Sequence, residues 1–365
     1  MYFDYDLFSK ILLMVLLPFI FVVIIIPFVK KLAFQIGAID KVRPNTRHIH
    51  TKTTPRLGGI AIFLGFLLGY MVFGTHSSIM NAVLIGSFII ILTGIVDDIS
   101  ELGPITKLIG QLSAALIIVF YGGLLIKDIT AFGLYINFSI LSYPLTVIFI
   151  LGCINCINLI DGIDGLSGGI SSIYFLTIGI IATIQGKLGL DFVMTFVMLG
   201  STLGFLVYNF HPATIFAGDT GAMFMGFMIS VIALLGFKNV TMTSLIIPLL
   251  ILAIPILDTL FAIVRRILKG ENPAKGDKLH IHHQLLNRNF SQRKTVLIIL
   301  IIDSLFAFAS IIYVLKDVMV GYIIYGLLLI IVISFIMKTN ILFDHEEIKK
   351  RLKKWDCWKS LQRLL

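Results

Sequence analysis

Residues 79–101 read IMNAVLIGSFIIILTGIVDDISE, an apolar run that ends in two adjacent carboxylates, Asp97 and Asp98. The apolar part, 79–96, is nearly long enough to cross a bilayer, because a spanning helix needs about 20 mostly apolar residues. Similar runs recur along the 365-residue chain, of which 58% is hydrophobic and only 13% is charged. This composition excludes an ordinary soluble domain and predicts an integral membrane protein.

Hydrocarbon offers no hydrogen-bond partner to the backbone, so the spans of such a chain are expected to be helices. We therefore predict an all-α, polytopic fold with about 11 transmembrane helices. The first span is too long, and is followed by too many others, to be a cleaved signal peptide. The expected spans are 8–29, 58–74, 79–96, 108–126, 142–160, 167–185, 190–208, 221–237, 242–264, 295–315 and 318–337.

The Lys and Arg residues predict which end of each span faces the cytoplasm. Alternate loops and the C-terminal segment hold 24 of the 29 Lys and Arg, in residues 30–57, 97–107, 265–294 and 338–365. Such a bias predicts that the N-terminus lies outside and the C-terminus in the cytoplasm. We expect residues 1–343 to form one transmembrane catalytic domain, and the basic tail 344–365 to form an amphipathic helix on the membrane surface.

Polar motifs lie in the loops that this topology places on the cytoplasmic side. The string KTTPRLGG, residues 52–59, sets Lys52 and Arg56 ahead of two glycines at a helix entry, an arrangement that favours an anion. An ordinary positive-inside loop is the alternative. Asp97 and Asp98 end the third span, and Lys107 follows on the next helix. The two acids either end a helix in water or belong to a charged pocket that holds cations.

The string NCINLIDGIDGL, residues 155–166, is the most specific motif of the chain. Helical spacing puts Asn155, Asn158 and Asp161 on one stripe, and two Asp-Gly steps leave the carboxylates of Asp161 and Asp164 at sharp turns. One Asp-Gly step is enough for a simple turn, so two of them indicate a site for a polar ligand or a cation.

Two further motifs complete the set. In FAGDTG, residues 216–221, Asp219 is flanked by glycines; it either caps the following helix or binds Mg²⁺ together with phosphate oxygens. In HIHH, residues 280–283, His280, His282 and His283 are a zinc-like cluster without cysteine, and contact with phosphate is the better interpretation. Carboxylates beside cations suit a metal ion that holds a polyphosphate next to a lipid.

Together these motifs resemble the polyprenyl-phosphate N-acetylhexosamine-1-phosphate transferase family, in order and along almost the whole chain. The resemblance implies Mg²⁺, with Mn²⁺ as a substitute, and transfer of a sugar 1-phosphate from a UDP-N-acetylhexosamine to undecaprenyl phosphate with release of UMP. It implies a multi-pass protein of the bacterial cytoplasmic membrane whose active site faces the cytoplasm. Membrane lipids and a second copy of the chain are the implied partners, and no nucleic acid is expected.

The resemblance also implies roles for individual residues. Asp219 matches the Mg²⁺ ligand, and Asp97 and Asp98 match paired acids that handle the lipid phosphate or the metal. Asn158, Asp161 and Asp164 match the lining of the nucleotide site, and Phe216 matches an aromatic that stacks on uracil. The positions that match phosphate contacts are Lys52, Lys107, His282 and His283, and Arg56 and His280 are also expected to bind substrate. We count Asp97, Asp98, Asp161, His282 and His283 as catalytic.

The three histidines also bear on the substrate. Ile281 interrupts them, a form that resembles the branch acting on UDP-N-acetylglucosamine in envelope glycopolymer synthesis, such as teichoic acid or O-antigen, rather than the muramoyl-pentapeptide branch of peptidoglycan synthesis. We expect the lipid phosphate to attack the β-phosphorus directly, with Asp97 positioning groups rather than removing a proton; a covalent acyl-phosphate is the alternative. A secondary transporter is a more remote alternative, because transporters bind at the midplane of the membrane.

Overall fold

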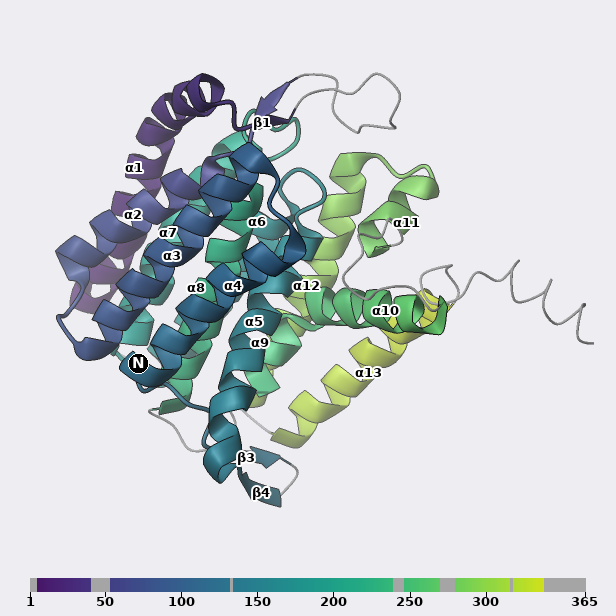
Figure 1. The fold of residues 1–365 in the computed structure, drawn as a ribbon. Coiled ribbons are helices and arrows are strands. Elements are labelled where there is room, and N and C mark those ends of the chain that lie inside the picture. The colour runs from purple at the N-terminus through teal and green to yellow at the C-terminus, as the bar shows by residue number, and fades with distance from the viewer. Residues whose placement is uncertain are drawn as a thin grey trace, which may run out of the picture.

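Long apolar helices make up most of the structure, a computed structural model that describes residues 5–40, 53–131, 134–238, 246–269, 280–315 and 318–337 (Figure 1). Within these residues, eight helices are long and apolar enough to cross a membrane, and two shorter apolar helices accompany them. The predicted all-α, polytopic fold is therefore confirmed. The expected tail 344–365 lies outside the described residues.

Ten of the eleven expected spans coincide with apolar helices or with one helix and its continuation. These helices are α1 (Tyr5–Ile36), α2 (Gly58–Phe73), α3 (Ser78–Ser100), α4 (Pro104–Leu116) with a π-helical turn (Ile117–Tyr121), α5 (Ser142–Ile160) after a 3₁₀ turn (Ser139–Leu141), α6 (Leu166–Ile184), α7 (Leu190–Asn209), α8 (Gly218–Lys238), α12 (Gln292–Leu315) and α13 (Val318–Met337).

The expected span 242–264 is wrong as a single helix. The structure divides it into α9 (Ile246–Ile251) and α10 (Ala253–Lys269), and α10 runs across the steeper helices in Figure 1. Pro255 explains the position of the break, because it has no N–H to donate to the carbonyl of Ile251 four residues earlier. The composition of the segment is apolar enough for a span, but its backbone cannot continue through the proline without losing that hydrogen bond.

Helix α8 is the centre of the bundle. Of its apolar window, 94% is buried, against 22% for α1, and the helices α2, α3 and α5 pack against it. Glycines allow the closest of these contacts. A Cβ on Gly59 of α2 would collide with the backbone of Gly221, and a Cβ on Gly94 of α3 would collide with the backbone of Thr220. The start of α8 is therefore fixed by backbone-to-backbone packing.

Two short hairpins were not predicted from the sequence. Strand β1 (Ile39–Asp40) pairs antiparallel with β2 (Thr54–Pro55), and β3 (Asp128–Ala131) pairs with β4 (Leu134–Asn137). Such short strands leave no readable alternation of apolar and polar residues. The first hairpin matters for the site, because the Pro55 carbonyl accepts a hydrogen bond from the Phe216 N–H, 2.8 Å away, and so ties β2 to the segment before α8.

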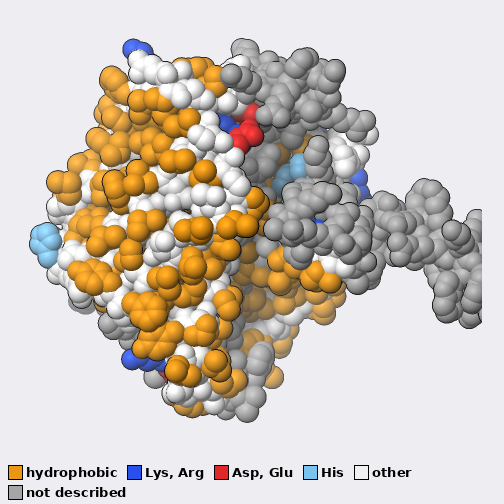
Figure 2. All heavy atoms as spheres, in the orientation of Figure 1, with side chains coloured by type: hydrophobic (Ala, Val, Ile, Leu, Met, Phe, Trp, Pro, Cys, Tyr) orange, Lys and Arg blue, Asp and Glu red, His pale blue; other side chains and the backbone are white. Residues whose placement is uncertain are grey.

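The surface matches this arrangement. In Figure 2, hydrophobic side chains cover most of the visible described face, and acidic side chains gather near the top next to a basic one. Exposed apolar side chains are stable in hydrocarbon, whereas the acidic patch needs water or cations. The polar chemistry is therefore concentrated at the end of the bundle where α3 ends and α8 begins.

Substitution of Gly94 tests the packing at the start of α8. We expect Gly94→Ala to lower the free energy of unfolding by about 1–3 kcal/mol, because the added methyl group meets the Thr220 backbone. The matched control is Gly152→Ala in α5, where no atom lies within 4 Å of the added Cβ and helix propensity should add up to about 1 kcal/mol. Thermal unfolding of the purified variants in detergent measures both, and equal midpoints would contradict the packing.

Candidate active site

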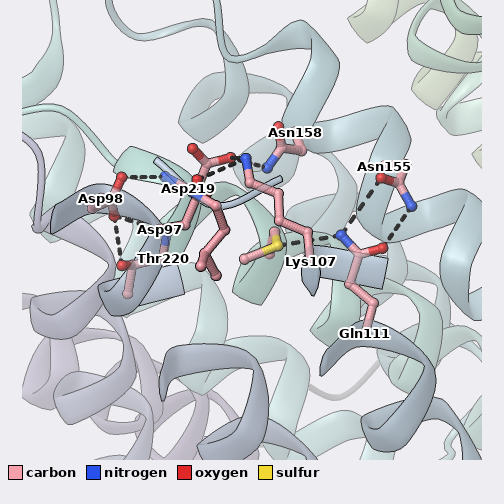
Figure 3. A network of polar contacts seen from close by, with 10 residues as sticks. Asp97, Asp98, Lys107, Gln111, Asn155, Asn158, Asp219 and Thr220 are labelled. Atoms are coloured by element: carbon pink, nitrogen blue, oxygen red, sulfur yellow. Dashed lines mark hydrogen bonds and ion pairs between the residues drawn. The ribbon is translucent and has the colours of Figure 1, made fainter. Parts of the chain in front are cut away.

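Four helices bring polar side chains together at one end of the bundle (Figure 3). Asp97 lies in the last turn of α3, Lys107 in the first turns of α4, Asn158 near the end of α5 and Asp219 in the first turn of α8. These residues are up to 122 positions apart in the sequence. They meet because each helix ends, or begins, at the same level of the bundle.

The ammonium group of Lys107 lies between two carboxylates. Its Nζ is 2.7 Å from Asp97 Oδ2 and 3.0 Å from Asp219 Oδ1. The same Asp219 oxygen accepts a hydrogen bond of 2.6 Å from the Asn158 side-chain amide. One cation therefore serves two buried or half-buried acids, and the three ionised side chains leave a net charge of −1.

The carboxylate of Asp98 has different partners from that of Asp97. Its side chain accepts hydrogen bonds from the backbone N–H groups of Asp219 and Thr220, at 2.9 and 3.1 Å, and from the Thr220 hydroxyl at 2.6 Å. Asp98 thus caps α8 from another helix, and its negative charge faces the positive end of the helix dipole. Gly218 has φ of +68°, and a Cβ there would collide with the Arg56 carbonyl, so only glycine fits this entry.

Both oxygens of Asp97 also have partners. Oδ1 accepts a hydrogen bond of 2.7 Å from the Leu102 N–H, and Oδ2 pairs with Lys107. The side chain is only 4% exposed. The carboxylate is therefore held in one orientation, with its charge directed at Lys107 and, beyond it, at Asp219.

Asp161 follows α5 directly and accepts a hydrogen bond from the Ser167 hydroxyl. The pKa of Asp161 is raised to about 6, mainly by burial and also by the charge of Asp219, against the lowering effects of the Ser167 hydrogen bond and the charge of Arg56. Asp161 therefore lies near enough to both Asp219 and Arg56 to respond to their charges.

Asp164 holds the loop between α7 and α8 in place. Its Oδ2 is 2.8 Å from His211 Nδ1 and accepts a hydrogen bond of 3.0 Å from the Ala213 N–H. Asn209 supports the same contact, since its side chain accepts from the Gly165 N–H and donates to the Ile215 carbonyl. Phe216 is half-buried at the end of this loop. The predicted nucleotide contact of Asp164 stays a prediction.

The histidine segment begins the short helix α11 (Ile281–Asn287) and packs against the turn after α5. His282 is 1% exposed, and a Cβ on Gly162 would collide with its ring. Burial, together with the charges of His283 and His280, lowers the pKa of His282 well below its usual value, so its imidazole is neutral. His280 pairs with Asp258 of α10, at 2.8 Å between Nδ1 and Oδ2.

The structure thus brings most of the predicted site residues to one region, including Asp97, Asp98, Lys107, Asn158, Asp161 and Asp219. Lys52 lies outside the described residues. Sequence reasoning missed Asp258, which lies within an expected span; a lone acid in an apolar run was the signal. It also missed the pairing of Gln111 with Asn155, whose amide donates to Gln111 Oε1 at 2.9 Å and ties α5 to α4 one turn away from the acids (Figure 3).

The carboxylates of the site suit an open Mg²⁺ site rather than a closed structural metal site. Among the described residues, no group of three His, Cys, Asp or Glu side chains is arranged to hold a metal ion. Asp97 and Asp219, however, already share one cation, the Lys107 ammonium. Mg²⁺ commonly takes one or two protein carboxylates and completes its shell with phosphate oxygens and water. The site therefore fits Mg²⁺ bound together with a phosphate substrate better than a closed structural metal site.

The two adjacent acids should respond differently to truncation. We expect Asp98→Ala to lower the free energy of unfolding by about 2 kcal/mol or more, because three donors at the start of α8 lose their acceptor. Asp97→Ala should cost less, about 1 kcal/mol, since only the Leu102 N–H loses its acceptor while the net charge of the cluster falls from −1 to zero. Thermal unfolding in detergent compares the two. A larger loss for Asp97→Ala would show that the assigned cap is wrong.

The stability should also depend on pH through Asp161. Its folded pKa, about 6, lies above the ordinary value of 3.8, so its stabilising contribution is complete below about pH 4 and is lost as the pH rises through 6. Asp161→Asn, which keeps an acceptor for Ser167, should therefore gain stability relative to the unchanged chain between pH 5 and 8. Unfolding midpoints of both proteins across this range test the prediction, and parallel curves would contradict it.

Comparison with known proteins gives the family. The model of glycosyl transferase family 4 matches residues 80–237, which include α3 to α8 and the acidic cluster. A Bacillus subtilis protein named probable undecaprenyl-phosphate N-acetylglucosaminyl 1-phosphate transferase is 42% identical over 80% of this chain and 81% of its own length. A Haemophilus influenzae undecaprenyl-phosphate alpha-N-acetylglucosaminyl 1-phosphate transferase is 31% identical over 76% and 80%, and a Mycolicibacterium smegmatis decaprenyl-phosphate N-acetylglucosaminephosphotransferase is 30% identical over 77% of each chain. The chain is therefore a multi-pass membrane transferase that belongs to glycosyl transferase family 4.

Proposed function

We propose that this enzyme transfers N-acetylglucosamine 1-phosphate from UDP-N-acetylglucosamine to undecaprenyl phosphate, with Mg²⁺, and releases UMP. The product would be undecaprenyl-diphospho-N-acetylglucosamine, the first lipid-linked intermediate of an envelope glycopolymer. The observation that carries the proposal is the Lys107 ammonium shared by Asp97 and Asp219 at the edge of an apolar bundle. The names of the relatives, one of them 42% identical, support the choice of donor and acceptor.

The chemistry joins two anions. An oxygen of the lipid phosphate forms a bond to the β-phosphorus of the UDP-sugar, and the bond from that phosphorus to the bridging oxygen breaks, so that UMP leaves with this oxygen. The second pKa of a phosphate monoester is near ~6, so the nucleophile is largely ionised at neutral pH and needs little help from a base. Bound Mg²⁺ would neutralise phosphate charge during the transfer.

The geometry of Asp97 supports a positioning role. Asp97 Oδ1 accepts from the Leu102 N–H and Oδ2 pairs with Lys107, so both oxygens serve contacts inside the protein. Its carboxylate holds Lys107, and Lys107 in turn lies beside Asp219. Asp219 would hold Mg²⁺ if the ion binds, and Lys107 beside it is placed to neutralise a phosphate oxygen.

The other polar groups near the acidic cluster are placed to bind the nucleotide and the phosphates of the UDP-sugar. Asn158, Asp161 and the loop that ends in Phe216 surround the acidic cluster on the side of the turn after α5, where a nucleotide would bind. Arg56 lies close enough to Asp161 to lower its pKa, so it can neutralise a phosphate in the same place. His282 packs against Gly162 in the same turn. We place the site on the cytoplasmic face of the bacterial inner membrane, where soluble nucleotide sugars are available.

A UMP-release assay tests the proposal. The purified protein, with undecaprenyl phosphate in detergent, should release UMP from UDP-N-acetylglucosamine when Mg²⁺ is present, and EDTA should abolish the release. Asp219→Asn should lose at least about 100-fold in kcat/KM, since it removes half of the shared carboxylate pair and the proposed metal ligand. The matched control is Asp191→Asn, a buried acid at the other end of the bundle, which should stay close to the unchanged enzyme.

The donor specificity decides between the branches of the family. Release of UMP with UDP-N-acetylglucosamine, and none with UDP-N-acetylmuramoyl-pentapeptide, is the expected pattern. The reverse pattern would assign the chain to the muramoyl-pentapeptide branch. Release that needs no lipid phosphate would contradict the proposed transfer.

A further inference from the structure

A buried carboxylate on α10 lies outside the acidic cluster and has no place in the proposed transfer. Asp258 is 3% exposed. Its Oδ2 is 2.8 Å from His280 Nδ1, and its Oδ1 accepts a hydrogen bond of 2.8 Å from the Ile281 N–H. The side chain of His280, the residue that precedes α11, makes no capping hydrogen bond of its own. Asp258 therefore caps α11 from a neighbouring helix and holds the first histidine at the same time.

The three histidine rings lie close together between this carboxylate and the turn that carries Gly162. The rings of His280 and His282 are parallel with centroids 5.8 Å apart, and the rings of His282 and His283 are 4.2 Å apart. His282 in turn lies against Gly162, next to Asp161. Because Asp258 also accepts from the Ile281 N–H, loss of its contacts would move the start of α11, the helix that carries His282 and His283.

Exposure divides the three histidines into two kinds. His280 is 4% exposed and has its Nδ1 committed to Asp258, whereas His283 is half-exposed. His282 is as buried as His280, but neither of its ring nitrogens has a hydrogen-bond partner in the described structure. A buried polar group without a partner is costly, so the nitrogens of His282 are the ones that await a ligand or water.

We propose that Asp258 and His280 are positioning residues: together they orient His282 and His283 toward the phosphates of the donor, and His280 makes no contact with substrate. This inference rests on the proposed function for its substrate and assigns His280 a role other than the expected substrate contact. A carboxylate that fixes the orientation and tautomer of an imidazole is a common device in enzymes, because it removes the freedom of the ring to rotate.

Two substitutions at His280 separate positioning from contact. The Asn side-chain amide can replace the Nδ1 group, so His280→Asn keeps the hydrogen bond to Asp258 and loses Nε2. His280→Gln mimics Nε2 and loses that bond. We expect kcat/KM for UMP release to stay within about threefold for His280→Asn and to fall at least about tenfold for His280→Gln, because small displacements of catalytic groups are costly. The opposite order would show that His280 contacts the substrate through Nε2 and would overturn the proposal.

Substitutions of Asp258 test the other half of the pair. Asp258→Ala should reduce kcat/KM at least about tenfold, and the double variant with His280→Ala should be no worse than Asp258→Ala alone, because His280 acts through its contact with Asp258. Asp258→Asn should retain more activity, since its amide can serve both partners when the proton of His280 moves to Nε2. Additive losses in the double variant would contradict the pairing.

A measurement that needs no activity separates this inference from the proposed function. His282 should react slowly with diethyl pyrocarbonate in the unchanged protein, because its side chain is 1% exposed. Asp258→Ala should raise the extent of its modification several-fold, read by mass spectrometry, whereas the distant control Asp191→Asn should not. Unchanged modification of His282 in a folded Asp258→Ala variant would overturn the positioning role. Absence of UMP release by the unchanged protein would instead overturn the proposed reaction alone.

Discussion

The shared ammonium group of Lys107 is the interaction on which the site depends. Two carboxylates near the end of a membrane helix bundle repel each other and lose hydration, so neither is stable there without a cation. Lys107 supplies that cation at hydrogen-bond distance from both Asp97 and Asp219. The chain's own lysine therefore brings the two acids together and offsets one of their two negative charges.

The position of Asp219 is set by the backbone rather than by its own side chain. Gly59 and Gly94 let α2 and α3 touch the first turn of α8, and the carboxylate of Asp98 accepts its first N–H groups. Glycine contacts of this kind are short and stiff because no side chain can adjust between the two backbones. The two adjacent acids thus have different roles. Asp98 holds the start of the helix that carries Asp219, and Asp97 holds Lys107, which pairs with Asp219.

Much of this could be read from the sequence, because apolar runs and the polar motifs at their ends are local signals. The spans of α1 to α8 follow from run length, and the acids of residues 97–98, 161 and 219 follow from their place at helix ends. The different partners of Asp97 and Asp98 could not be read, since adjacent residues look equivalent until the direction of each side chain is known. The role of Asp164 in holding its loop was hidden for the same reason: its partner, His211, is 47 positions away.

The break between α9 and α10 is a further difference between the predicted and the observed fold, and it affects the histidine segment. Hydropathy alone predicts one span at 242–264. In such a continuous helix, Asp258 would follow α9 on one straight axis. Pro255 instead allows α10 to turn and to pack against α5 and α12. On this transverse helix, Leu260, Val264 and Ile267 form an exposed apolar stripe, whereas Asp258, Arg265 and Arg266 are buried. The charged residues of α10 are thus turned into the protein, where Asp258 meets the start of α11. The proline that interrupts this apolar run therefore contributes to the arrangement of the site. The bend after α9 directs the charged face of α10 toward the histidine segment, which an uninterrupted span could not do.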